Sequence, residues 1–141
     1  MNKSIAFLVL FLVFNLSSSF IENRVVDNKE NLCGLEVADA YTQEVLGKNI
    51  GFYVKFYNNS DKTVDAIEYK VIFKNGFNEI KGSKVFTWQV GNLVGPMKPK
   101  SYLSDGSTNW IDNANKLEVK IIRVHFTDDS TCDSKTSIKT L

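Results

Sequence analysis

The sequence contains one histidine, two cysteines and two prolines. Ser-His-Asp or Cys-His catalysis would therefore depend on His125, which alternation places on the solvent side of a β-like run. Structural zinc takes four Cys or His ligands, and the chain offers three. No glycine-rich turn leads into a helix, so a phosphate-binding loop is not expected. We therefore expect a protein that is not an enzyme and holds no metal or cofactor.

A large excess of charge of either sign is also missing. Lys and Arg number 17 and Asp and Glu number 16, whereas nucleic-acid binders usually have a strong basic excess. Hydrophobic residues make up 43% of the chain, which argues against intrinsic disorder. The length of 141 residues indicates one globular domain, and the balanced charge predicts no nucleic-acid partner.

The N-terminus carries the one long apolar run. Lys3 precedes about a dozen mostly apolar residues, and the small residues Ser17 and Ser19 follow. This order is typical of a secretory signal peptide, and the run is too short for a membrane-spanning helix, which needs roughly 20 residues. We predict a signal peptide at 1–19 and no membrane span after its cleavage. The remaining 122 residues then carry 16 basic and 16 acidic side chains.

The two cysteines, Cys33 and Cys132, lie near opposite ends of that remaining chain. In an exported protein an even pair is most simply one disulfide. Two free buried thiols or a catalytic cysteine are the alternatives. We expect a secreted or periplasmic protein with a flexible segment at 20–32 and one domain at 33–141.

From Cys33 onward the pattern is β. Apolar residues alternate with polar ones over residues 50–57, 63–74 and 84–90, and shorter strands are expected near 35–40, 101–104 and 136–140. Residues 39–46 are compatible with one helical turn. Asn75-Gly76 predicts a hairpin, and Asp105-Gly106 predicts a turn. We predict an all-β antiparallel sandwich of about seven strands, with a barrel as the alternative.

One long strand, residues 117–126, has two phases of alternation. Leu117, Val119 and Ile121 suit one face, whereas Ile122, Val124 and Phe126 suit the other. Either the strand is buried on both faces, or a bulge at Ile121-Ile122 shifts the register.

Four segments between residues 35 and 130 resemble small bacterial extracytoplasmic Ig-like domains, among them the FxLYD-like modules. Residues 56–67 are similar to their "N-x-S-x-K-T-I" stretch, 72–76 to their "Y-N-x-x-G" hairpin, 94–99 to their "G-P-I-x-P-G" loop and 122–129 to their closing "I-x-Y-x-D-G". The F-x-L-Y-D string itself is absent, and Lys100 and Asp129 stand where those domains have Gly. The resemblance implies an Ig-like β-sandwich and carries over no functional residues.

Aromatic residues are the best candidates for a ligand site. Tyr53 and Tyr57 lie on the strand face opposite the core-facing set, and Trp110 lies in a polar stretch. Exposed aromatic rings suit a sugar ring or a protein hot spot, although cross-strand packing is the simpler interpretation of the tyrosines. Trp88 is in phase with Phe86 and Val90, so we expect it in the core.

Two polar segments have a possible binding role. Asp128, Asp129 and Asp133 could supply Ca²⁺ ligands, but a solvated turn is the favoured interpretation. Asn58-Asn59-Ser60 is a formal N-glycosylation site, relevant in a eukaryotic source.

Three functions remain open at this point. The favoured one is an exported Ig-like domain that binds a protein partner or serves structurally in the cell envelope. The second is a carbohydrate-binding module that uses Tyr53, Tyr57 and Trp110. The third is a small periplasmic inhibitor protein.

Overall fold

The computed structural model describes residues 23–24, 31–45, 48–91, 94–108 and 114–134. Within them the chain forms nine strands and no helix. The strands are β1 (Asn23–Arg24), β2 (Asn31–Leu32), β3 (Leu35–Val45), β4 (Lys48–Asn58), β5 (Val64–Lys74), β6 (Ile80–Gln89), β7 (Tyr102–Ser107), β8 (Lys116–Phe126) and β9 (Thr131–Asp133). Trp110, the predicted signal peptide and the strand expected near 136–140 lie outside the described residues.

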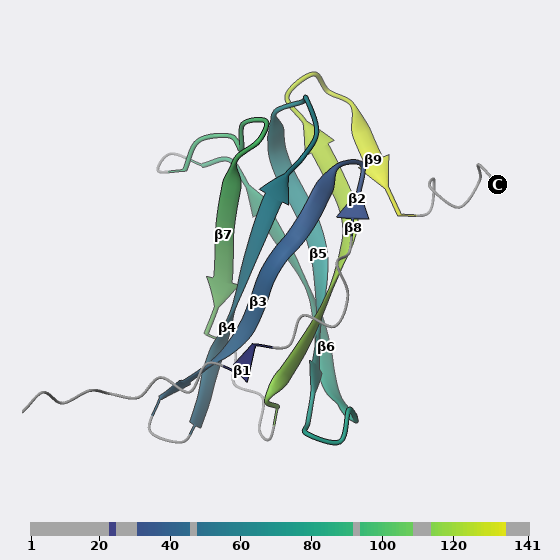
Figure 1. Ribbon diagram of the computed structural model, residues 1–141. Helices are drawn as coiled ribbons and strands as arrows, with labels where there is room; N and C mark the ends of the chain where they lie inside the picture. The colour runs from purple at the N-terminus through teal and green to yellow at the C-terminus, as the bar shows by residue number, and fades with distance from the viewer. Residues whose placement is uncertain (1–22, 25–30, 46–47, 92–93, 109–113, 135–141) are drawn as a thin grey trace, which may run out of the picture.

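Two antiparallel sheets pack against each other, as expected for a β-sandwich (Figure 1). One sheet has the order β1-β3-β4-β7, and β2 also pairs with β3. The other has the order β6-β5-β8-β9. The all-β antiparallel prediction is therefore confirmed.

The core lies between the sheets and is built by alternation. Residues that point inward from β4, β5 and β8 are at most 5% exposed: Phe52, Val54, Phe56, Ile67, Tyr69, Val71, Phe73, Leu117, Val119, Ile121, Val124 and Phe126. Trp88 is also buried, as predicted. The buried Tyr69 hydroxyl on β5 donates to the Asp105 carboxylate on β7 at 2.7 Å, which joins the two sheets through a polar contact.

A bulge explains the two phases of β8. Arg123 pairs with Glu68 and Ile121 pairs with Tyr69, so Ile122 is an extra residue opposite this point of β5. The insertion turns both Ile121 and Val124 into the core, and Ile122 is only half-buried. Of the two alternatives that alternation left open, the bulge is the one observed.

At three places the structure adds to the sequence analysis or differs from it. Residues 39–45 continue β3, because this segment pairs along β4, so no helical turn forms there. Asp105 and Gly106 lie inside β7, where pairing with β4 outweighs their turn preference. The hairpin after β5 forms, but its loop is 75–79, and Asn78 rather than Gly76 takes the left-handed backbone, with φ 65°.

The chain before Cys33 contributes to the sheet. Strands β1 and β2 lie within the segment predicted to be flexible, and Leu32 is 5% exposed. Cys33, in the turn between β2 and β3, lies at disulfide distance from Cys132 on β9, with Cα atoms 6.4 Å apart. The predicted cysteine pair thus joins the start of one sheet to the last strand of the other.

Candidate functional site

Tyrosines gather on the outer face of the sheet formed by β3, β4 and β7. Phe52, Val54 and Phe56 point inward from β4, so Tyr53 and Tyr57 point outward. Register places Tyr41 of β3 beside Tyr53, and Tyr102 of β7 beside Tyr57. Four of the five tyrosines of the chain therefore share this surface, which we call the tyrosine face: Tyr41, Tyr53, Tyr57 and Tyr102.

The four rings form two cross-strand pairs. The ring centroids of Tyr41 and Tyr53 are 4.8 Å apart and stacked, with an interplanar angle of 27°. Those of Tyr57 and Tyr102 are also 4.8 Å apart, at 38°. The Tyr53 hydroxyl is hydrogen-bonded to the Ser104 hydroxyl on β7. Such contacts hold the rings in fixed orientations before any ligand arrives.

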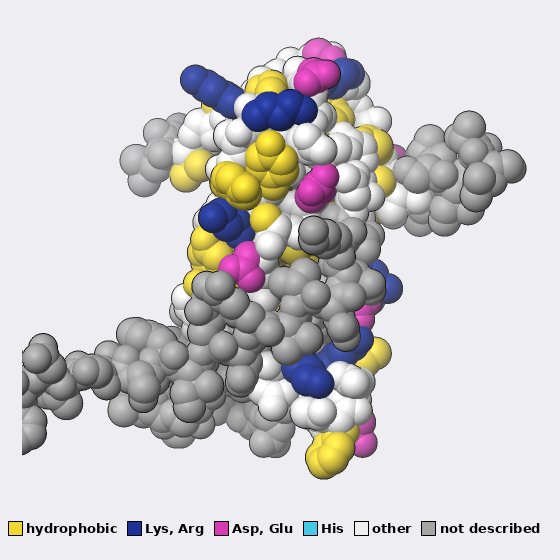
Figure 2. Space-filling view, viewed as in Figure 1, with side chains coloured by type: hydrophobic (Ala, Val, Ile, Leu, Met, Phe, Trp, Pro, Cys, Tyr) yellow, Lys and Arg dark blue, Asp and Glu magenta, His cyan; other side chains and the backbone are white. Residues whose placement is uncertain are grey.

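Lys55 lies between the two pairs on β4. Its Nζ is 4.5 Å from the centroid of the Tyr102 ring, a cation–π contact. Register puts Asp39 opposite Lys55, and Glu36 opposite Tyr57. The face therefore combines aromatic rings with charges of both signs. Figure 2 shows such a mixture of hydrophobic, basic and acidic side chains on the upper part of the visible surface.

The tyrosine face remains accessible in part. Tyr102 is 60% exposed, and the other three tyrosines are half-buried against their neighbours. Beside Tyr53 the surface is hollowed into an open depression of about 530 Å³, lined by Gln43, Phe52, Tyr53, Gly106, Ser107 and Thr108.

Sequence reasoning found half of this face. It placed Tyr53 and Tyr57 outward, as observed, but grouped them with Trp110, which lies outside the described residues. It missed Tyr41 and Tyr102. Strict alternation from Leu35 and Val37 would have turned Tyr41 inward. The register shift between Val37 and Asp39 turns it outward, and pairing with β4 places it beside Tyr53.

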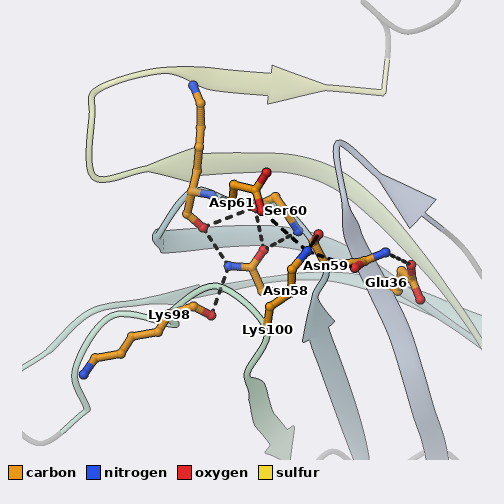
Figure 3. Close-up of polar contacts among 8 residues, drawn as sticks. Glu36, Asn58, Asn59, Ser60, Asp61, Lys98 and Lys100 are labelled. Atoms are coloured by element: carbon orange, nitrogen blue, oxygen red, sulfur yellow. Dashed lines mark hydrogen bonds and ion pairs between the residues drawn. The ribbon is translucent and has the colours of Figure 1, made fainter.

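At one end of the sandwich, a buried asparagine joins two loops (Figure 3). Asn58 is fully buried, and its Nδ2 donates to the carbonyl groups of Lys62 at 2.8 Å, Met97 at 3.3 Å and Lys98 at 3.2 Å. Its Oδ1 accepts the Ser60 N–H at 3.1 Å and the Ser60 hydroxyl at 2.6 Å. An N-linked glycan would have to be attached to Asn58 Nδ2, which is buried and donates to these carbonyl groups. The formal glycosylation site is therefore a structural element.

The other polar candidates also have local partners. His125 points outward, as predicted, and its Nδ1 is 2.6 Å from Asp65 Oδ1. Asp128 lies in the predicted turn, where Lys62 Nζ is 2.8 Å from Oδ2 and Ser130 bonds to Oδ1. Hydrogen bonds from Lys62 and Ser130 lower the pKa of Asp128 well below its ordinary value. Among the described residues, no group of three or more His, Cys, Asp or Glu is arranged to hold a metal ion.

Comparison with protein-family models, curated proteins and solved structures found no match to this chain. The described part of the chain has no helix with the length and apolarity needed to cross a bilayer.

Proposed function

We propose that this chain is an exported, non-enzymatic Ig-like domain that binds a protein partner through the tyrosine face. The observation that carries the proposal is the arrangement of Tyr41, Tyr53, Tyr57 and Tyr102 in two ordered pairs around Lys55. A structural role in the cell envelope would use the same tyrosine face to contact a neighbouring protein.

Tyrosine suits protein recognition for two physical reasons. Each ring offers a large amphipathic area, and fixing its two side-chain torsions costs little entropy. Here the paired rings have already lost much of that freedom, so a partner gains contact area with little further ordering. The two pairs lie along a sheet surface, on either side of Lys55, and such an extended face matches a protein surface better than one sugar ring.

Strand order supports the Ig-like assignment. From β3 to β9 in chain order, the first, second and fifth strands form one sheet, and the fourth, third, sixth and seventh form the other. Ig-like domains share strands A, B and E in one sheet and C, F and G in the other, and the variable type adds C′ beside C. Moreover, Lys100 and Asp129, which replace glycines of the resembling domains, have φ of 56° and 62°, the left-handed conformation that glycine favours.

Export is supported by two features of different origin. Residues 1–19 have the order of a signal peptide. Cys33 and Cys132 lie at disulfide distance, and such bonds persist in oxidising compartments. Both favour a secreted or periplasmic location.

The protein-binding proposal is tested by chemical cross-linking and quantitative mass spectrometry with cell-envelope material of the source organism. The bait variants are Tyr57→Ala/Tyr102→Ala and, as a matched aromatic control, Phe77→Ala, which changes an 88% exposed ring on the β5–β6 hairpin. We expect one partner to be enriched by the unchanged protein and the control, and at least about tenfold less by the double variant. Equal enrichment by all three baits would contradict the proposal.

Carbohydrate binding is a second candidate, favoured by the depression beside the Tyr53 ring and its stacked neighbour Tyr41. Aromatic stacking with hydroxyl groups of Ser107 and Thr108 nearby suits a sugar ring. A glycan array with the unchanged protein and Tyr53→Ala tests it: binding lost in the variant supports this function, and no binding to any glycan rejects it.

A further inference from the structure

In the described part of the chain, β6 forms one edge of its sheet, because β5 is the one strand that pairs with it. It is 10 residues long, and both prolines of the chain lie outside it. Val90 N–H donates to the Asp65 carbonyl at 2.9 Å, so the backbone N–H and C=O groups of Val90 point to β5. Along a strand of an antiparallel pair, these groups point to alternate sides at successive residues. Those of Trp88 and Phe86, two and four residues before Val90, therefore also point to β5.

The intervening residues point their N–H and C=O groups to the open edge: Ser83, Val85, Thr87 and Gln89. All four are exposed, and Val85 is 46% exposed. The register with β5 is regular from Gly82 to Gln89, and its one shift lies at Phe73/Lys74, near the start of β6. An exposed, regular edge of this kind is a template for another strand.

We propose that the strand added to this edge is β6 of a second copy of the same chain, antiparallel about a twofold axis at Phe86. This register engages all four edge residues of both copies. It places Val85 opposite Thr87 and Ser83 opposite Gln89, each as a hydrogen-bonded pair. The contact is self-complementary, as a twofold interface must be.

Charge favours the same register. Strand β6 contains Lys81 and Lys84 and no acidic residue. Registers that place lysines of the two copies opposite each other are therefore destabilised by charge repulsion. In the proposed pairing Lys84 lies opposite Trp88 of the second copy and not opposite a lysine. Within one copy, Lys84 Nζ is 5.6 Å from the centroid of the Phe86 ring, a cation–π contact.

Packing on the inner side also fits. The half-buried Phe86 ring contacts Phe52, with centroids 4.7 Å apart, and Tyr69, with centroids 5.8 Å apart. At the twofold axis the two Phe86 residues form a non-hydrogen-bonded pair, in which side chains approach most closely. The aromatic cluster of one copy is thereby continued into the other.

A charge-swap experiment tests both the dimer and its register. Sedimentation equilibrium over a range of concentrations should show a reversible dimer of the unchanged protein. Val85→Asp/Thr87→Asp places carboxylates opposite each other at two symmetric positions and should weaken the dimer at least about tenfold. Val85→Asp/Thr87→Lys places opposite charges at the same positions and should restore it. Both side chains are on the outer surface, and circular dichroism verifies that each variant keeps its fold.

The controls separate this proposal from the preceding one. Tyr57→Ala/Tyr102→Ala and Phe77→Ala should leave the dimer unchanged. A monomer at every concentration overturns the proposal, as does a dimer that neither charge variant weakens. Equal dissociation by both charge variants rejects the register. Capture of a different protein at β6 by a monomeric chain also rejects the second copy as the occupant.

Discussion

At the scale of the residue, Asn58 shows how one polar side chain can determine the conformation of two loops. We predict that Asn58→Ala lowers the free energy of unfolding by about 3 kcal/mol, because the carbonyl groups of Lys62, Met97 and Lys98 lose a donor in a buried site. Urea denaturation measures the change. Asn59→Ala is the control, since this exposed neighbour should cost less than about 1 kcal/mol. Equal costs would show that the network contributes little.

Tyr69 gives the fold a dependence on alkaline pH. Burial, and secondly the hydrogen bond with Asp105, raise the pKa of Tyr69 above its ordinary value near 10. The folded protein thus keeps this proton where the unfolded chain loses it, so the contribution is present below about pH 10 and decreases as pH rises above it.

We therefore predict that Tyr69→Phe costs about 1 kcal/mol at pH 7, for the lost hydrogen bond, and less at higher pH. Urea unfolding between pH 7 and pH 11 measures the free energy of unfolding of the unchanged protein and of Tyr69→Phe. The two free energies should converge above pH 10. Curves that stay parallel would contradict the role assigned to the Tyr69 proton.

At the scale of the element, the attachment of β7 to β4 depends on a close backbone approach. A Cβ atom on Gly106 would lie 2.5 Å from the Phe52 carbonyl oxygen. We predict that Gly106→Ala lowers stability by about 2 kcal/mol, because the backbone must shift to relieve the overlap. Gly91→Ala, where no atom lies within 4 Å of the added Cβ, should be nearly neutral.

Thermal unfolding of both glycine variants measures this difference. Because Gly106 pairs with Tyr53, we also expect Gly106→Ala to change the near-ultraviolet circular dichroism of the tyrosine face. Two equally stable variants would show that β7 can move away from β4 at little cost.

At the scale of the whole molecule, the cysteine pair connects chain positions 99 residues apart. Closing a loop of that length restricts the unfolded chain, and the chain-entropy model gives a stabilisation of about 4–5 kcal/mol. We predict that Cys33→Ala/Cys132→Ala lowers the denaturation midpoint in urea strongly.

Mass spectrometry without reductant provides the direct check. The bonded protein has two hydrogen atoms fewer than the reduced one, and alkylation should label neither cysteine. Two labelled thiols in the exported protein would contradict the bond.

Much of the fold followed from local pattern. The inward residues of β4 and β5, the buried Trp88 and the turn at Asp128 were each predictable, because alternation and turn chemistry act within a few residues. One cause explains why residues 39–45, where a helical turn had been left open, and Asp105-Gly106, where a turn was predicted, both lie in strands. In both segments, pairing with β4 supplies backbone hydrogen bonds that outweigh weak local preference.

The tyrosine face, in contrast, depends on the tertiary structure. Alternation within β4 was sufficient to turn Tyr53 and Tyr57 outward, since a strand has a period of two. Their partners Tyr41 and Tyr102 come from different strands, and their positions beside Tyr53 and Tyr57 depend on the register of β3 and β7 against β4. The bulge at Ile122 and the open edge of β6 are likewise properties of pairing. Side-chain periodicity thus decided which residues are buried in the regular strands, because it acts within one segment. Contacts between distant segments decided where a bulge shifts that pattern and which exposed residues meet.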